Sequence, residues 1–248
     1  MIDWVVEHLR LTAFPATGTF DAASSQTWFE RVTGDVPEQS ITQQRGALAV
    51  VSGPLAKHQG VQMQLQVDPV AVHWRLLAAG LGSGSELNSI GVLANFEAPF
   101  KELAAAWLRV APALRRLAVG AVLVHPVQGR SEGHAELQKL LPAIAIPERA
   151  EDLLYQINRP RMSTIFEALK VNRVTKFSVG VVQRFTVGVT EIPAFGQADS
   201  QYFTRLETDL STPADRRDAF RTDDDSLREL LSELWDMTFE ISLQGDID

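Results

Sequence analysis

A chain of 248 residues with 45% hydrophobic side chains can bury a sizeable core, as one domain or as two closely packed halves. It has no cysteine, which excludes disulfides, thiolate metal sites and a cysteine nucleophile, and its net charge of -8 argues against binding polyanions over the whole surface. There is no apolar run of transmembrane length and no basic start typical of a secretory signal, so we expect a cytoplasmic protein with no membrane partner.

The first half of the chain predicts one strand, a helix, three strands and a second helix. The expected strands span residues 4–14, 46–52, 60–67 and 70–79, and the expected helices span residues 24–32 and 95–110. Residues 61–67 alternate apolar side chains with glutamines, a pattern typical of an antiparallel strand with one solvated face.

A glycine-rich loop over residues 80–85 contains Gly-x-Gly-x-Gly and raises the question of a phosphate cradle. A dinucleotide fingerprint needs a helix that starts at once, and a phosphate-binding P-loop needs Gly-Lys-Ser/Thr. Neither is present here, so the composition favours a flexible connector.

The second half predicts the same order of elements. Strands are expected over residues 116–124, 153–158, 172–190 and 201–210, and helices over residues 131–141 and 222–239. Residues 163–169 are variable in character, with a short helix as one interpretation. In the two long strands, apolar and polar side chains alternate with a period of two, which predicts one buried face in each.

The element order predicts an α+β fold: a mainly antiparallel, curved sheet with the two long helices on one face. Residues 1–112 and 113–248 would each follow the order strand, helix, three strands, helix, as a pseudo-repeat without residue identity. We expect the two halves to join edge to edge into one compact unit.

Three segments, residues 116–124, 202–210 and 227–239, resemble a sporadically distributed family of uncharacterised bacterial proteins of about this length. The resemblance covers residues 95–240. It implies a bacterial cytoplasmic accessory protein from variable gene neighbourhoods, and it brings no activity and no site residues.

No catalytic, cofactor or metal site is expected from the residue pattern. The five histidines are scattered without a metal-ligand spacing, and no Gly-x-Ser-x-Gly elbow occurs. Glu207 and Asp209 share one strand face with Arg205; a hard-cation site would need a further oxygen ligand, so a polar face with cross-strand arginine partners is the better interpretation.

Charge is distributed unevenly along the second half. Residues 159–184 contain several basic side chains and a single acidic one, Glu167. Residues 207–248 contain 13 acidic residues and four arginines. Two interpretations stay open: the two regions neutralise each other within the fold, or the basic segment is a docking surface for nucleic acid or an acidic partner. The candidate binding residues are Arg159, Arg161, Arg173, Lys176 and Arg184.

The leading hypothesis for function is a non-enzymatic accessory protein that binds a protein partner. One alternative is a nucleic-acid-binding module that uses the basic segment over residues 159–184. The other is a small-molecule binder or hydrolase with a pocket between sheet and helices, where five side chains would converge: Trp74, Arg75, Trp107, Glu207 and Asp209.

Overall fold

A computed structural model describes residues 2–43, 47–56, 58–80, 87–147, 149–184, 199–216, 218–220 and 225–245. The elements follow in the order β1 (Val5–Pro15), α1 (Ser24–Thr33), β2 (Gln39–Gln43), β3 (Leu48–Pro54), β4 (Val61–Val67), β5 (Val72–Ala78), β6 (Gly91–Val92), the 3₁₀ helix η2 (Leu93–Asn95), α2 (Glu97–Leu108), β7 (Leu114–Val127), α3 (Arg130–Leu140), β8 (Leu154–Asn158), β9 (Arg161–Met162), β10 (Lys170–Arg184), β11 (Asp199–Ser211) and α4 (Asp225–Gln244).

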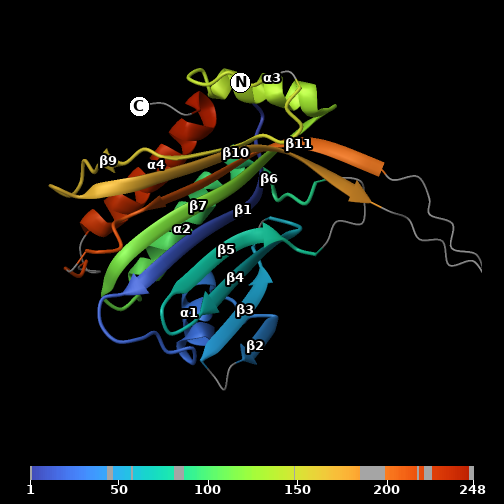
Figure 1. Cartoon of the computed structure of the whole chain (residues 1–248). Helices are drawn as coiled ribbons and strands as arrows, with labels where there is room; N and C mark the ends of the chain where they lie inside the picture. Colours follow the sequence, from blue (N-terminus) through green and yellow to red (C-terminus); the bar gives the residue numbers. More distant parts are fainter. Residues whose placement is uncertain are drawn as a thin grey trace, which may run out of the picture.

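The strands form one open, eleven-stranded antiparallel sheet (Figure 1). The order across it is β2-β3-β4-β5-β1-β7-β11-β10-β8, and the short strands β6 and β9 pair with β1 and β10. The two halves of the chain meet where β1 pairs with β7, and in each half the last long strand lies beside the first. The predicted α+β fold with a mainly antiparallel, curved sheet is therefore confirmed, while the pseudo-repeat stays a prediction.

The helices pack on one face of the sheet. Helix α1 contacts β3 and β4, α3 contacts β10 and β11, and α4 contacts β7 and β11 while packing against α2 (Figure 1). Three fully buried tryptophans fill the space between the sheet and these helices: Trp74, Trp107 and Trp235. Since no described helix lies on the opposite face, that face of the sheet is open.

The predicted alternation of buried and solvated side chains is present in the strands. In β4 the residues Val61, Met63, Leu65 and Val67 are buried while the glutamines between them are partly exposed. In β11 residues 204, 206, 208 and 210 are buried, and the alternate positions lie on the open face. The period of two therefore assigned the faces correctly wherever the strands are regular.

Strand β7 lies at the centre of the sheet, as its apolar run predicts. It continues through Pro126 to Val127, beyond the expected stop at His125. Proline is tolerated there because position 126 lies near the end of the strand, opposite Phe203 of β11.

The structure decides one open interpretation and adds one strand. Residues 163–169 form turns instead of a helix, because Ser163 and Thr164 donate hydrogen bonds to the Glu233 carboxylate of α4. Strand β2 was missed, since all five of its residues are exposed and it carries no apolar pattern. Residues 81–85 of the glycine-rich loop and residues 185–190 of the expected long strand lie outside the described part of the chain.

The ends of the described chain lie close together. The indole N–H of Trp4, just before β1, donates a 2.8 Å hydrogen bond to the carbonyl of Ser242 in the last turn of α4. Among the described residues, no helix combines the length and the apolar character needed to cross a membrane.

Candidate functional site

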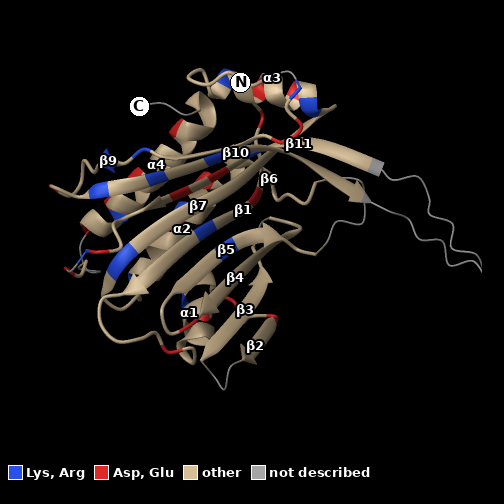
Figure 2. Ribbon diagram, viewed as in Figure 1, with Lys and Arg blue, Asp and Glu red and all other residues tan. Residues whose placement is uncertain are grey.

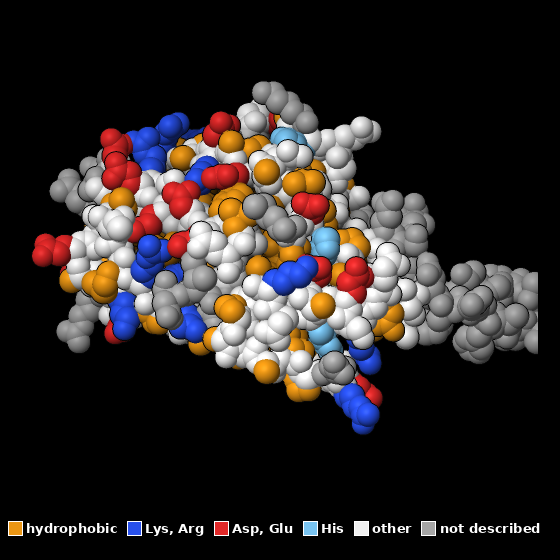
Figure 3. Space-filling view, turned by 90° about the horizontal axis from the view of Figure 1, so that it is seen from above, with side chains coloured by type: hydrophobic (Ala, Val, Ile, Leu, Met, Phe, Trp, Pro, Cys, Tyr) orange, Lys and Arg blue, Asp and Glu red, His pale blue; other side chains and the backbone are white. Residues whose placement is uncertain are grey.

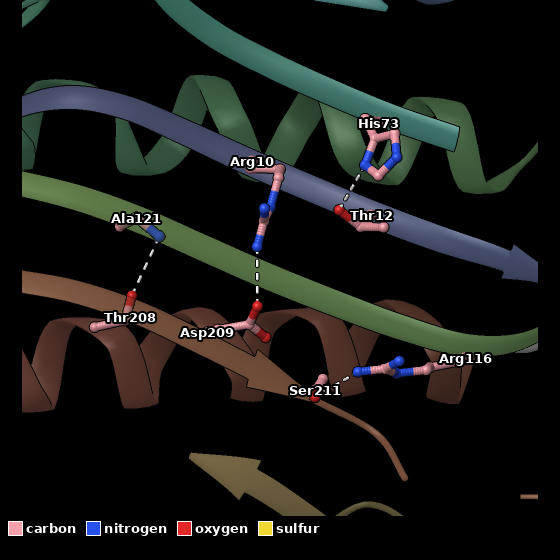
Figure 4. Close-up of polar contacts among 8 residues, drawn as sticks. All are labelled: Arg10, Thr12, His73, Arg116, Ala121, Thr208, Asp209 and Ser211. Atoms are coloured by element: carbon pink, nitrogen blue, oxygen red, sulfur yellow. Dashed lines mark hydrogen bonds and ion pairs between the residues drawn. The ribbon is translucent and has the colours of Figure 1, made fainter. Parts of the chain in front are cut away.

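The open face of the sheet carries two ion pairs that cross over the central strand β7. Arg10 of β1 reaches Asp209 of β11, with Nη2 2.9 Å from Oδ2 (Figure 4). In the opposite direction, Arg205 of β11 reaches Glu7 of β1 at 3.5 Å. The strand between them is thus bridged from both sides, which ties the first half of the chain to the second.

Gly120 of β7 makes the first of these bridges possible. It lies in one cross-strand row with Arg10 and Asp209. A Cβ atom at this position would stand 3.3 Å from Nη2 of Arg10 and 3.1 Å from the carbonyl oxygen of Thr208. A side chain at this position would therefore crowd the guanidinium that crosses the strand, and glycine avoids this contact.

The arginines in turn cover β7, which no described helix covers on this side. Val122 and Val124 are only 7% and 2% exposed although they belong to the open face. Long arginine side chains can shield apolar surface with their methylene stems while the charged ends stay in reach of water. The two ion pairs that span β7 therefore shield part of the central strand from water.

A second row of charges continues to β10. Lys176 Nζ donates to Glu207 Oε1 at 2.9 Å, and Nε of Arg205 lies 3.2 Å from the same oxygen. Figure 2 shows red segments of β11 between blue segments of β10 and β1. The three side chains are between 29% and 34% exposed, so they are partly desolvated and their interactions are stronger than those of surface pairs.

These side chains surround a hollow of about 370 Å³ on the open face. Its lining includes the small or apolar residues Gly120, Val122 and Val174 together with charged side chains of both signs. Gln156 of the edge strand β8 stands exposed at its border.

A β-bulge in β1 brings two consecutive side chains to this face. The pairing with β7 slips by one residue between Val6 and His8. Glu7 therefore contacts Arg205 while the next residue, His8, lines the hollow. Strict alternation would have placed them on opposite faces.

A cluster of polar side chains lies next to the hollow, on strands β5 and β1. Arg75 lies directly opposite Arg10 and donates to Gln64 Oε1 at 3.1 Å. His73, two residues from Arg75, shares a 3.0 Å hydrogen bond with the Thr12 hydroxyl (Figure 4).

Burial and positive charge shift the titration of this group. The pKa of His8 is lowered to about 4, first by burial and then by the positive charges of Arg10, Arg205 and Arg75. The negative charge of Glu207 acts in the opposite direction. Burial and the neighbouring arginines also lower the pKa of His73 to about 4, against the effect of Asp68. Both imidazoles are therefore neutral near pH 7.

Two further groups of this face titrate abnormally. Burial and the Arg10 charge lower the pKa of Arg75. Burial raises the pKa of Glu7, although the Arg205 charge acts in the opposite direction. The open face is thus partly shielded from water even though no described helix covers it.

We expect stability to fall as the pH drops from 6.5 towards 4. In the unfolded chain the histidines take up a proton near pH 6.5, whereas in the folded protein His8 and His73 stay neutral down to about pH 4. The unfolded state then binds more protons, so the stabilisation is complete above pH 6.5 and is lost through this window. Allowing for partial exposure, the loss is about 1 kcal/mol for each histidine.

Urea unfolding at several pH values checks this expectation. Glu7 acts in the opposite direction, because its raised pKa makes the folded protein bind a proton more readily and so adds stability as the pH falls. The informative comparison is therefore with a His8→Gln, His73→Gln variant, whose stability should change less between pH 7 and pH 5. An equal slope in both proteins would contradict the assignment.

The structure does not gather the predicted binding residues on one surface. Arg173 points to the helix side and is 4% exposed, while Lys176 points to the open face and pairs with Glu207. Arg161 pairs with Glu240 of α4 at 2.8 Å. Arg159 lies between β8 and β9, and the side chain of Arg184 lies outside the described part of the chain.

Two of these basic residues are thus paired with acids of the following segment. This pairing supports the interpretation that the basic and acidic regions neutralise each other within the fold. Acidic and basic side chains are also intermixed on the surface seen in Figure 3.

The side chains proposed to converge between sheet and helices are also divided. Trp74 and Trp107 belong to the apolar core on the helix side. Arg75, Glu207 and Asp209 lie on the open face of the sheet. The predicted cross-strand arginine partner of the acidic pair is present, as Arg10 bound to Asp209.

Sequence reasoning missed Arg10, His8 and Gly120, which lie at the centre of the observed site. Gly120 offered the one signal that could have found them, because a glycine inside an apolar strand marks close approach of another group. In the described residues, no group of three histidine, aspartate or glutamate side chains could hold a metal ion. Comparison of the whole sequence with known protein families and with curated proteins finds no match.

Proposed function

We propose that this protein is a non-enzymatic accessory protein that binds a protein partner on the open face of its sheet. The observation that carries the proposal is the one-sided cover of the sheet: the helices pack on one face, and the other presents a hollow ringed by charged side chains. Antiparallel sheets tolerate one solvated face, and a hollowed, charged face of this size offers a docking surface. A bacterial cytoplasmic setting, implied by the resemblance of residues 95–240, belongs to the same proposal.

The charge balance of this face favours an acidic partner surface. On strands β5, β1, β7 and β11 the open face has four cations against three carboxylates, within a chain whose net charge is -8. Lys176 of β10 adds a further cation. The cations are Arg10, Arg75, Arg116 and Arg205, and the carboxylates are Glu7, Glu207 and Asp209.

A protein suits this face better than nucleic acid does. Glu207 and Asp209 stand between the cations of β10 and those of β1, where they would repel a phosphate backbone. A protein surface can place a basic side chain opposite each carboxylate and an acidic one opposite each free cation.

A matched pair of tryptophan substitutions tests the proposal. Gln156→Trp places a large ring at the border of the hollow, where the glutamine is exposed, without removing any of the ion pairs. Gln244→Trp makes the same change at an exposed position of α4, on the helix side. The partner is first isolated from the native host by co-purification and then prepared pure, and its affinity is measured by calorimetry.

We expect Gln156→Trp to weaken the purified complex by at least about 100-fold, because a misplaced ring excludes the close fit that such interfaces need. Gln244→Trp should bind as the native protein does. If both variants bound the partner equally well, the interface would not lie on the open face. Retention of nucleic acid that weakens steeply with salt, and is lost on replacing the partly exposed Lys176 with alanine, would replace a protein partner by the nucleic-acid alternative.

A further inference from the structure

Two arginines oppose each other directly on the open face. Arg10 and Arg75 are register partners on the antiparallel strands β1 and β5, so their Cβ atoms are about 5 Å apart. Like charges in such a pair destabilise a sheet, and partial burial strengthens the repulsion. The Arg10–Arg75 pair is therefore unfavourable for folding, and the stability of the fold gives no reason for it.

The two guanidinium groups differ in their partners. Arg10 is neutralised by Asp209, whereas among the described residues the hydrogen-bond partner of Arg75 is the uncharged amide oxygen of Gln64. In the described part of the chain, no carboxylate forms an ion pair with Arg75. Its positive charge is strong enough locally to act on His8 and His73.

The side chains around Arg75 on this face are mostly neutral and polar. Along β1 and β5, the next open-face positions are His8 and Thr12 beside Arg10, and His73 and Leu77 beside Arg75. His73 is fixed by the Thr12 hydroxyl, with Asp68 3.7 Å from its other ring nitrogen. The charged groups that act on the two imidazoles are Arg10, Arg75, Arg205, Glu207 and Asp68.

We infer that Arg75, with Arg10 beside it, forms a carboxylate-binding site that receives an acidic side chain of the protein partner. The inference rests on the proposed function, since it assigns the partner's chemistry at the docking face. A guanidinium binds a carboxylate through two parallel N–H···O bonds, and Arg75 offers such a fork, to which the described residues contribute no carboxylate.

The charge count favours a carboxylate over a phosphate group. One negative charge balances Arg75, because Asp209 already balances Arg10. A second negative charge bound at Arg75 would have to draw on Arg10, whose charge is already engaged by Asp209.

Binding of small probes to the full chain tests the site at pH 7. The probe is N-acetyl-glutamate amide, its uncharged control is N-acetyl-glutamine amide, and N-acetyl-phosphoserine amide represents the phosphate alternative. The readout is the NMR signal of the arginine Nε–H groups. We expect the signals of Arg10 and Arg75 to shift saturably with the glutamate probe and to be unaffected by the glutamine probe.

Two variants locate the binding. Arg75→Gln should weaken the glutamate probe at least tenfold, while Arg161→Gln, which removes the ion pair with Glu240 on another surface, should not. Arg75→Gln removes the like-charge repulsion, so its urea midpoint should not fall below that of the native protein. Equal weakening in both variants, or tighter binding of the phosphoserine probe, would overturn the inference.

The outcome is separable from that of the proposed function. If Gln156→Trp abolishes partner binding but the glutamate probe does not bind, the docking face stands and the carboxylate site is wrong. If the probe binds at Arg75 but the partner ignores Gln156→Trp, the site stands and the docking face is wrong.

Discussion

Replacing Trp235 with alanine is expected to lower the free energy of unfolding by about 3–5 kcal/mol. Trp235 lies fully buried on α4, and its ring meets Phe100 of α2 edge to face, with centroids 4.7 Å apart. The substitution removes this aromatic pair and leaves a cavity at the contact between the two long helices. A urea unfolding curve with an unchanged slope and a lower midpoint would measure the loss.

The matched control lies on the same helix. Glu229→Ala changes an exposed side chain of α4 and should alter stability by no more than about 0.5 kcal/mol. If Trp235→Ala cost less than about 1 kcal/mol, the packing of α4 against α2 would have to be different from that described.

Gly120→Val is expected to destabilise the protein by about 1–3 kcal/mol and to abolish partner binding. Valine is a favourable strand residue, so strand propensity alone predicts no loss. The structure predicts the opposite because the new side chain would press on the Thr208 carbonyl and on the Arg10 guanidinium. Arg10 would be displaced from Asp209, and part of the hollow would be filled.

A double-mutant cycle separates these two contacts. In an Arg10→Ala background the guanidinium is absent, so Gly120→Val should cost less than it does in the native protein. The part that remains reports the contact with the Thr208 carbonyl. Identical costs in the two backgrounds would show that Arg10 does not lie across Gly120.

The regular elements were predictable where side chains alternate or recur with a clear period. The strand over residues 61–67 and the face assignment of residues 202–210 follow from a period of two, and the two long helices follow from apolar residues three and four apart. Strand β2 was not predictable, because an edge strand with five exposed residues buries nothing that the pattern could reveal.

The turn at residues 163–169 shows a different limit. Its backbone conformation depends on the Glu233 carboxylate, which is about 70 positions away in the chain. Local sequence does not indicate this partner, so it cannot distinguish a short helix from the turns that the contact with α4 imposes.

By itself the sequence determined the α+β class, the period of each long element and the side of each regular strand that becomes buried. These depend on local periodicity, which the hydrophobic effect converts directly into burial. Only the tertiary structure decided which strands are neighbours, and therefore which charges meet. The pairing of β1 with β7 and of β7 with β11 brings Arg10 to Asp209, and the bulge before His8 turns two consecutive side chains to one face. Electrostatic contacts of this kind act through space over a few ångströms, so their partners are set by strand register and not by distance along the chain.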